Sequence, residues 1–450
     1  MRINKVHLKN FRCFDNFTIE FENDLTVIVA ENGRGKSAIL DAVAVAVGPY
    51  LSCFNGAKAY NFSDSDVMQV QQDNNGSKLR ILRMKRQYPI ILEAEGVLGG
   101  KSVSWQREMM REGGRTTVKN AKALTDYGHK MQKEVHGEHD ENVILPVIAY
   151  YGTTRMWEDA KILAGNRKKL NLERDSGYFE AMEPANTYQT FGHWFQYASL
   201  SAMEFDWYLK ERNSDEKNPY REVLKAVSRA IGISLSSMGW KDIDYSVSLQ
   251  SLVVTHEHIG TLPVSALSDG IRSVISLVAD IAYRMARLNP DLGEEAAIKT
   301  PGIVMIDEVD MHLHPSWQQR VVADLQKAFP LVQFIITTHS PQVLTTVPAR
   351  SIRALRWDDG QVEIYSPEFS LGAESYQLLR EIQNVETRPK TLPIVKTLMR
   401  YLELVSDDQW DSEEAIALRK ELDEWGKNME PALVKADMDI KMRAYRRNKK

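Results

Sequence analysis

The chain of 450 residues is long enough for two or three domains, and its 43% hydrophobic and 26% charged residues are typical of a soluble globular protein, which excludes collagen and wholesale disorder. The 57 Lys and Arg residues against 61 Asp and Glu residues give a net charge of −4, which excludes a global positive field as the means of finding nucleic acid. Two cysteines exclude a disulfide framework, and the apolar runs fall short of the roughly 20 residues of a membrane helix. We therefore expect a cytoplasmic protein without a secretory signal or a membrane span.

Residues 1–54 form the predicted N-terminal lobe. Apolar and polar side chains alternate over residues 3–11 and 17–21, which is typical of strands with one buried face. Residues 25–29 are almost wholly apolar, as in a strand that is buried on both faces of a sheet. A Gly-rich turn and an apolar helix that starts at Ser37 follow. This order predicts a strand, a loop and a helix.

Two segments of different composition are predicted to be insertions. Residues 55–142 are polar, and we expect them to hold strands and one exposed helix. Residues 176–263 carry aromatic side chains at helical intervals, so we expect this segment to be mostly helical. Between the two insertions, residues 143–175 return to the core with a buried strand and a loop.

The second half of the chain predicts an α/β core followed by helices. Residues 264–364 contain a long amphipathic helix, a strand at 303–306, a helix after Pro315 and a strand at 332–337. Residues 365–450 are expected to form amphipathic helices that end in a basic tail. The alternation of buried strands and helices predicts an α/β fold class.

A glycine-rich loop follows the buried strand at 25–29. It runs Ala30-Glu31-Asn32-Gly33-Arg34-Gly35-Lys36-Ser37, which departs from the P-loop pattern in having Ala30 where that pattern has Gly. In a P-loop, successive backbone N–H groups and the positive end of the next helix bind phosphate, so we predict that residues 32–35 cradle the phosphates of ATP. Lys36 is predicted to reach the β- and γ-phosphates, and Ser37 to ligate Mg²⁺. The alternative is a Gly-rich turn with a solvated Lys36.

Two more polar strand ends fit the chemistry of a P-loop. The strand at 303–306 leads into Asp307 and Glu308, and we predict that Asp307 holds Mg²⁺ while Glu308 orients or activates the attacking water. The strand at 332–337 leads into His339, which lies 32 residues after Asp307 and is predicted to hydrogen-bond the γ-phosphate. The alternatives are solvated acids at a strand end and a structural histidine in a turn.

Ser268, Asp269 and Gly270 precede the long helix. A Ser and a Gly at a helix N-terminus can bind an anion, but Ser-Asp-Gly is also a common N-cap and turn. Because Ser268 lies 39 residues before Asp307, the set resembles the signature motif of the ATP-binding-cassette (ABC) superfamily. In that superfamily the signature of one subunit closes over ATP held by the P-loop of another. The resemblance implies that Ser268 and Gly270 complete the site of a second copy, in a homodimer or a higher homo-oligomer.

The motifs together resemble the branch of structural-maintenance (SMC) ATPases, RecF-type ATPases and OLD nucleases, over about residues 1–50 and 143–360. The resemblance implies an ABC-type ATPase head, in which a P-loop sheet is flanked by helices, with helical and β insertions and a C-terminal helical segment. It also implies that Arg12, in the opening strand, lies close to the nucleotide. No glutamine stands at a convincing Q-loop position.

Three further stretches narrow the resemblance. Residues 149–155, 267–273 and 430–440 are similar to PtuA, the ATPase of Septu and retron-linked anti-phage defence systems. PtuA acts with an HNH nuclease, PtuB. The resemblance therefore implies an ATPase subunit that uses ATP and Mg²⁺ to control an HNH nuclease, with nucleic acid reached through the complex.

Two other functions stay open at this point. A RecF-like repair ATPase would act directly on DNA, and an OLD-type nuclease would cleave nucleic acid itself. Asp437 and Asp439 resemble the acidic pair of the Toprim nuclease domain, but their helical surroundings leave no room for the sheet that would hold two metal ions. We therefore expect no nuclease chemistry in this chain.

Two histidine pairs and the C-terminal tail each have two interpretations. His312 and His314 fit either a metal site or packing of the loop after Asp307, and a third spaced ligand is missing. His136 and His139 fit either a metal site or an exposed polar turn. Residues 441–450 carry six basic side chains, which either dock the nuclease or nucleic acid or form a solvated tail.

Overall fold

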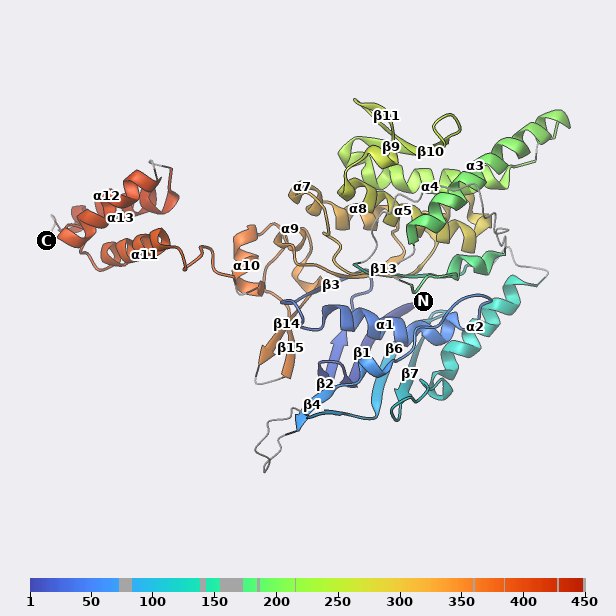
Figure 1. Cartoon of the computed structure of the whole chain (residues 1–450), viewed down its shortest axis with the longest axis horizontal. Helices are drawn as coiled ribbons and strands as arrows, with labels where there is room; N and C mark the ends of the chain where they lie inside the picture. The colour runs from blue at the N-terminus through green and yellow to red at the C-terminus, as the bar shows by residue number, and fades with distance from the viewer. Residues whose placement is uncertain are drawn as a thin grey trace. The chain divides into compact units, whose positions relative to one another are not determined.

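The computed structural model describes residues 1–72, 83–137, 143–153, 173–183, 187–214, 216–358, 361–383, 385–426 and 429–447. The chain divides into two compact units, Met1–Leu378 and Leu379–Lys450. The first unit carries the β-sheets, and helices α11, α12 and α13 lie in the second (Figure 1).

The first unit is built on a six-stranded sheet. Its order is β15 (Gln361–Tyr365), β14 (Ile352–Asp358), β3 (Leu25–Val29), β13 (Val332–Thr337), β12 (Gly302–Ile306) and β8 (Val147–Tyr151). The strands from β14 to β8 are parallel, and β15 is antiparallel to β14. β3, β8, β12 and β13 are buried along their whole length, as their apolar runs predicted. Because parallel strands end at one edge of a sheet, the residues that follow β3, β12 and β13 share that edge. The α/β fold class is confirmed.

A second sheet is antiparallel. Its order is β2 (Phe14–Glu20), β1 (Arg2–Phe11), β6 (Ile90–Leu98) and β7 (Lys101–Met109), and a separate hairpin pairs β4 (Gln69–Gln72) with β5 (Arg83–Arg86). Buried side chains alternate with exposed ones along β2 and β6, as expected for strands with one buried face. β6 and β7 complete this sheet beside β1, although they belong to the segment at 55–142 that we expected to be an insertion. The division of the chain into six segments stays a prediction.

Helix α1 (Lys36–Leu51) lies between the two sheets. It contacts β1, β6 and β7 of the antiparallel sheet and β13 of the parallel one. Its residues are buried except for Ser37. Helix α2 (Lys122–Val135) also contacts α1 and buries Leu124, Met131 and Val135. The helix expected in this segment is thus exposed on one face only, because its apolar side chains recur at helical spacing.

Donors from β7 compensate for a proline inside α1. Pro49 has no N–H to donate to Val45 O, which lies one helical turn earlier. The guanidinium of Arg107 donates to Val45 O at 2.8 Å instead, and Trp105 Nε1 donates to Ala46 O at 2.9 Å. Burial lowers the pKa of Arg107 to about 10, which still leaves the side chain charged at neutral pH.

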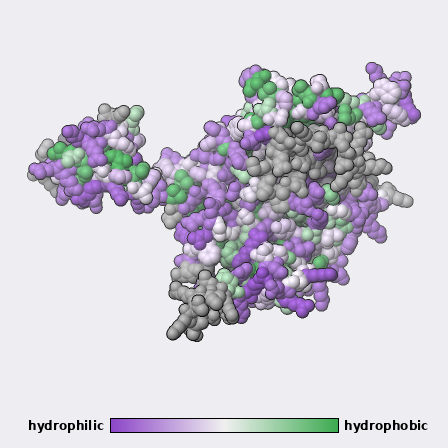
Figure 2. Space-filling model, viewed as in Figure 1, coloured by the Kyte–Doolittle hydropathy of each residue, from purple (hydrophilic) through white to green (hydrophobic). Residues whose placement is uncertain are grey.

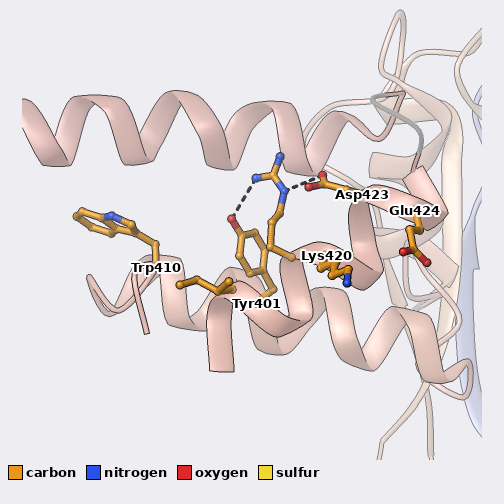
Figure 3. A pocket seen from close by; sticks show the side chains of 7 residues that line it. Tyr401, Trp410, Lys420, Asp423 and Glu424 are labelled. Carbon is orange, nitrogen blue, oxygen red and sulfur yellow. Dashed lines mark hydrogen bonds and ion pairs between the residues drawn. The ribbon is translucent and has the colours of Figure 1, made fainter. Parts of the chain in front are cut away.

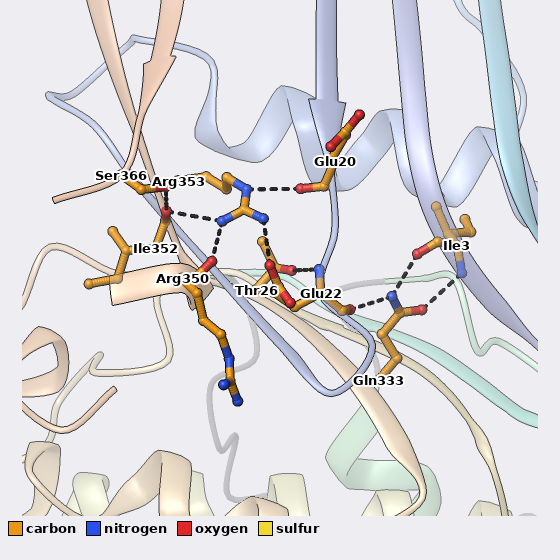
Figure 4. Close-up of polar contacts among 9 residues, drawn as sticks. All are labelled: Ile3, Glu20, Glu22, Thr26, Gln333, Arg350, Ile352, Arg353 and Ser366. Carbon is orange, nitrogen blue, oxygen red and sulfur yellow. Dashed lines mark hydrogen bonds and ion pairs between the residues drawn. The ribbon is translucent and has the colours of Figure 1, made fainter. Parts of the chain in front are cut away.

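Polar contacts join the two sheets of the first unit (Figure 4). The buried amide of Gln333, on β13, accepts from Ile3 N at 2.9 Å and donates to Ile3 O at 2.6 Å and to Glu22 O at 2.8 Å. Arg353, on β14, donates to Glu20 O at 2.9 Å and pairs with the Glu22 carboxylate at 3.0 Å. The first two strands of the chain are thereby fixed to the parallel sheet.

The rest of the first unit is mostly helical. It comprises α3 (Thr187–Glu211), α4 (Pro219–Leu235), α5 (Asp269–Leu288), α6 (Ala296–Lys299), α7 (Pro315–Gln318), α8 (Val321–Ala328), α9 (Pro341–Leu344), α10 (Ser375–Gln383) at its boundary, and the strands β9 (Trp240–Ser246), β10 (Ser251–His256) and β11 (Gly260–Pro263). Figure 1 shows α3, α4 and α5 on the side of the parallel sheet away from α1. The segment at 176–263 holds α3 and α4 but also the sheet β11-β10-β9, which we did not predict because strands of four to seven residues give a weak period-2 signal.

The second unit contains α11 (Pro393–Ser406), α12 (Glu413–Gly426) and α13 (Pro431–Arg447). Its core consists of Leu398, Tyr401, Leu404, Val405, Ala415, Leu422, Leu433 and Ala436. The amphipathic helices expected in this part of the chain are present, because each contributes apolar positions at helical spacing to one core.

A cavity of about 560 Å³ opens on the second unit (Figure 3). Its lining comprises Tyr401, Trp410, Ile416, Arg419, Lys420, Asp423 and Glu424. Arg419 donates to Tyr401 OH at 3.1 Å, to Asp423 at 2.8 Å and to Asp437 on α13 at 3.0 Å. This last hydrogen bond lowers the pKa of Asp437. One carboxylate of the Toprim-like pair therefore serves an ion pair within a helical bundle.

The face of the molecule seen in Figure 2 is mixed in polarity. On the face seen in Figure 2, hydrophobic residues form small patches among hydrophilic ones. Within the described ranges, the search for a membrane-spanning helix finds none that is long and apolar enough.

Candidate nucleotide-binding site

The glycine-rich loop joins β3 to α1 at the carboxyl edge of the parallel sheet. Gly33 and Gly35 have φ angles of 73° and 94°, a region that favours glycine. A Cβ atom on Gly35 would lie 2.6 Å from the Phe14 ring and 2.8 Å from Cys13 Sγ, so the turn between β1 and β2 packs directly against the loop. Ala30, which replaces the glycine of the P-loop pattern, is buried at the end of β3.

Lys36 is the first residue of α1, and its side chain folds back over the loop. Nζ donates to Ala30 O at 3.0 Å and to Glu31 O at 3.1 Å. Burial lowers the pKa of Lys36, and the nearby carboxylates of Asp307, Glu308 and Asp310 oppose this shift. A phosphate in the loop would offer the ammonium a charged acceptor in place of two neutral carbonyls, which makes a stronger hydrogen bond.

Ser37 and Asp307 meet across the sheet edge. Ser37 Oγ donates to Asp307 Oδ2 at 2.7 Å, and Thr337 Oγ1 donates to the other carboxylate oxygen at 2.5 Å. Mg²⁺ prefers oxygen ligands and is commonly bound by one or two carboxylates together with the phosphates of a substrate. The hydroxyl of Ser37 and the carboxylate of Asp307 therefore fit a Mg²⁺-nucleotide.

Two threonines at the end of β13 position the acidic residues. Thr337 Oγ1 accepts from Glu308 N at 2.8 Å, and Thr338 Oγ1 donates to Asp310 at 2.5 Å. These contacts hold Glu308 at a φ of 49°, which is uncommon for a residue with a side chain. Our sequence reasoning missed both threonines, although their place at the end of a buried strand, directly before His339, was an available signal.

His339 lies half-buried at the same edge. Burial and then the charge of Lys36 lower the pKa of His339, against the opposing effect of the nearby carboxylates. The structure thus brings five of the predicted site residues together, namely Lys36, Ser37, Asp307, Glu308 and His339. Asn32, Gly33, Arg34 and Gly35 form the loop beside them.

Arg12 lies in the turn between β1 and β2, next to α1. Its guanidinium pairs with Asp41 at 2.6 Å and with Asp66 at 2.7 Å. Tyr60 OH donates to the same Asp41 carboxylate at 3.1 Å. Arg12 is thus held by two carboxylates, of which Asp41 lies one helical turn beyond Ser37 on α1. Our sequence reasoning named neither of them.

The signature residues lie apart from the loop. Ser268 is an exposed N-cap of α5, and no hydrogen bond or ion pair joins it or Gly270 to residues 30–37 in the described part of the chain. A Cβ atom on Gly270 would lie 2.4 Å from His312 O, so the start of α5 packs directly against the loop that follows Asp307. Among the described residues, no hydrogen bond or ion pair thus links the two halves of the predicted site within one chain.

One histidine of each pair has a structural partner. His314 caps α7 by accepting from Ser316 N at 3.3 Å, and His136 lies 3.8 Å from the Asp175 carboxylate. The described ranges hold no group of three His, Cys, Asp or Glu side chains that could bind a metal ion. His139, Arg155, Lys449 and Lys450 lie outside the described residues, and so do the side chains of Arg446 and Arg447.

Comparisons with known proteins show a family and several relatives of this chain. A family model described as AAA ATPase domain matches residues 1–344. The Retron Ec83 probable ATPase of Escherichia coli is 26% identical over 99% of this chain and 88% of its own length. The Septu protein PtuA of Bacillus mycoides is 45% identical over 75% of this chain and 38% of its own length. The SMC head domain from Thermotoga maritima is 16% identical, with a TM-score of 0.43 over 82% of this chain and 100% of that one.

The predicted resemblance to retron-linked and Septu ATPases is confirmed. The family model spans the glycine-rich loop, both carboxylates after β12 and His339 after β13. This chain is therefore an ATPase that belongs to the AAA ATPase domain family.

Proposed function

We propose that this ATPase binds ATP with Mg²⁺ at composite sites between two copies of the chain and thereby controls a partner HNH nuclease in an anti-phage defence complex. Lys36 binds the β- and γ-phosphates, and Ser37 and Asp307 hold Mg²⁺. Glu308 orients or activates the attacking water, and His339 contacts the γ-phosphate. The contact of 2.7 Å between Ser37 and Asp307, beside the buried Lys36, carries this proposal.

The composite arrangement is supported by the position of the signature residues. Ser268 is exposed at the N-terminus of α5, where backbone N–H groups and the helix dipole favour an anion. Gly270 lets that N-terminus pack closely against His312, because a Cβ atom there would lie 2.4 Å from His312 O. A second copy of the chain supplies the loop that α5 faces in this proposal.

The nuclease partner rests on the resemblance to PtuA. Retron and Septu proteins are among the relatives of this chain. The second unit is the proposed docking element, since Ile416, Met438 and Met442 expose apolar side chains on α12 and α13. Large exposed apolar side chains that gather on one unit are a common mark of a protein interface.

A RecF-like repair ATPase that acts directly on DNA is the second candidate. The observation in its favour is the exposed position of Lys119, Lys122, Lys130 and Lys133 on and beside α2. Contacts of lysines with phosphate release counterions, so binding of DNA by the chain alone would weaken steeply with salt. A steep salt dependence in the absence of any nuclease would favour this second function.

The test combines a Glu308→Gln variant with the HNH protein expressed beside the chain. The amide keeps the shape of the side chain but loses the base, so we expect Glu308→Gln to form a stable dimer in ATP and Mg²⁺, measured by light scattering, and to change nuclease activity. Glu204→Gln, an exposed change on α3, is the matched control. If wild type and Glu308→Gln stay equally monomeric under all conditions, the composite site is refuted.

A further inference from the structure

Trp357, on β14, lies beside the P-loop. β14 is the neighbour of β3 on the side away from β13, and Ala354 pairs with Val29 in the parallel register. Trp357 is three residues beyond Ala354, and Asn32 is three residues beyond Val29. Both therefore lie beyond the last residue of β3, Asn32 in the loop that follows this strand and Trp357 in the part of β14 that extends past it and pairs with β15.

A direct contact joins this tryptophan to the loop. The Arg34 guanidinium lies over the Trp357 indole at 5.3 Å from the ring centroid, a cation–π arrangement. Arg34 also pairs with Glu31 at 3.3 Å, within the loop. Arg34 stands between two glycines of positive φ, so the backbone around it is set by the phosphate-binding conformation of the loop.

Packing alone does not explain the buried N–H group of the Trp357 indole. Trp357 is half-buried, and its Nε1 is buried without a hydrogen-bond acceptor among the described residues. Buried indole N–H groups usually find a partner, and a native group that lacks one calls for an explanation. A side chain kept for ligand contact is one such explanation.

The layout of the sheet gives the direction in which a nucleotide extends. Asp307 and His339 follow β12 and β13, and both strands lie on one flank of β3. In the proposed ATP site the γ-phosphate lies near Asp307 and His339 on that flank, so we expect the ribose and base to extend towards the opposite flank. That opposite flank is β14, where the Arg34 guanidinium lies over the Trp357 ring.

We infer that Trp357 and Arg34 form the platform for the base of the bound nucleotide and favour purine nucleoside triphosphates. This inference rests on the proposed ATP site and adds to it a residue that selects the base. Indole and guanidinium planes stack on any base, and a purine offers the larger face. The platform therefore separates purines from pyrimidines rather than adenine from guanine.

Calorimetric titration of the full chain with MgATP and with inorganic tripolyphosphate tests the platform. Loss of one stacked base weakens binding by roughly 5- to 150-fold, so Trp357→Ala is expected to raise the Kd for ATP by that factor. The Kd for tripolyphosphate, which has no base, is expected to stay unchanged. Trp357→Phe should restore most of the ATP affinity, and Trp207→Ala, at an exposed tryptophan on α3, is the matched control.

Fluorescence supplies a second measurement that needs only the conservative variant. ATP is expected to change the tryptophan emission of the wild type, and tripolyphosphate is not. Trp357→Phe should remove the ATP-dependent change. If it persists undiminished in Trp357→Phe, the platform is overturned even where Trp357→Ala fails to fold.

The outcomes separate this inference from the proposed function. If Trp357→Ala binds ATP like the wild type while Lys36→Ala does not, the platform is wrong and the ATP site stands. Equal weakening of ATP and tripolyphosphate by Trp357→Ala also overturns the platform, because it shows that the tryptophan only supports the loop through Arg34. Unchanged ATP binding in Lys36→Ala contradicts the ATP site itself.

Discussion

At the scale of single residues, substitution of Lys36 is the strongest test of the proposed ATP site. The ammonium of Lys36 is already buried over the loop, where it donates to two carbonyl oxygens. We expect Lys36→Ala to abolish ATP binding in calorimetric titration, because no other cation holds this position and Arg34 points to Trp357 instead.

Lys396→Ala is the matched control for this prediction, since Lys396 is an exposed lysine on α11. Its ATP affinity should equal that of the wild type. A folded Lys36→Ala variant that binds ATP normally would remove the P-loop role from residues 30–37.

The lowered pKa of His339 predicts that the free energy of unfolding depends on pH. Burial lowers the pKa of His339 below its ordinary value of about 6.5. The unfolded chain then binds a proton near pH 6.5 that the folded chain does not bind, so the free energy of unfolding decreases as the pH falls from about 6.5 through the lowered pKa. We expect the imidazole of the nucleotide-free protein to titrate below pH 6.5 by NMR.

A His339→Gln variant isolates this contribution from those of the other histidines. Its free energy of unfolding should decrease less than that of the wild type over the same acid range. A titration midpoint at or above pH 6.5 would show that His339 is solvated rather than enclosed by the site.

How far the site could be predicted depended on the kind of residue. Lys36, Asp307 and His339 stand out in the sequence because each follows a buried strand and carries a charged or titratable group. Thr337 and Trp357 do not, since a threonine or tryptophan in a strand is also an ordinary β-former. Their contacts with Asp307 and Arg34 depend on which strands are neighbours, and that order is set by long-range packing. The catalytic and binding roles stay predictions.

At the scale of elements, Arg107 and Pro49 form a pair that can be tested together. Arg107→Met leaves Val45 O buried without its donor, and we expect the free energy of unfolding to fall by about 2–4 kcal/mol in urea denaturation. Adding Pro49→Ala returns a backbone N–H to Val45 O, so the double variant should regain part of this loss.

The single variant Pro49→Ala is the control for the double variant. In it, the guanidinium of Arg107 still donates to Val45 O. If the double variant loses as much free energy of unfolding as the two single variants together, Arg107 does not act through the carbonyl that the proline leaves unpaired.

Elements were predictable where the local pattern was strong. The apolar runs of β3, β12 and β13 and the long amphipathic helix α5 were found from the sequence, because burial on both faces and a period of 3.6 are clear signals. β9, β10 and β11 were missed because their few residues carry little periodicity. The pairing of β6 with β1 was not foreseen, since it joins residues about 90 apart in the chain.

At the scale of the whole molecule, deletion of the C-terminal tail distinguishes a tail that docks the nuclease or nucleic acid from a tail that is merely solvated. Deleting residues 441–450 leaves Leu433 and Ala436 in the core of the second unit, so we expect ATP binding to be intact. Capture of the nuclease in a pull-down, or binding of nucleic acid at two salt concentrations, should weaken. Six lost cations are enough to change the salt dependence if they contact phosphate.

Arg443→Ala is the control for the tail. It removes the contacts of Arg443 with Ser406 O at 3.0 Å and with Asp408 at 2.8 Å and keeps the other five basic residues. A truncated chain that matches the wild type in both assays would leave the tail without a docking role.

The strand order of the parallel sheet also fixes when the protein can fold during synthesis. β3 lies between β13 and β14, and Val332, the first residue of β13, is 307 residues beyond Leu25. At roughly 5–20 residues per second, a ribosome needs about 15–60 s to deliver these neighbours. Until then the apolar run of β3 has no strand on either side, although β1, β2 and α1 are already made. The nucleotide site is thus among the last parts of the first unit to be completed, and a nascent chain that stalls before residue 332 exposes an edge on which other chains can aggregate.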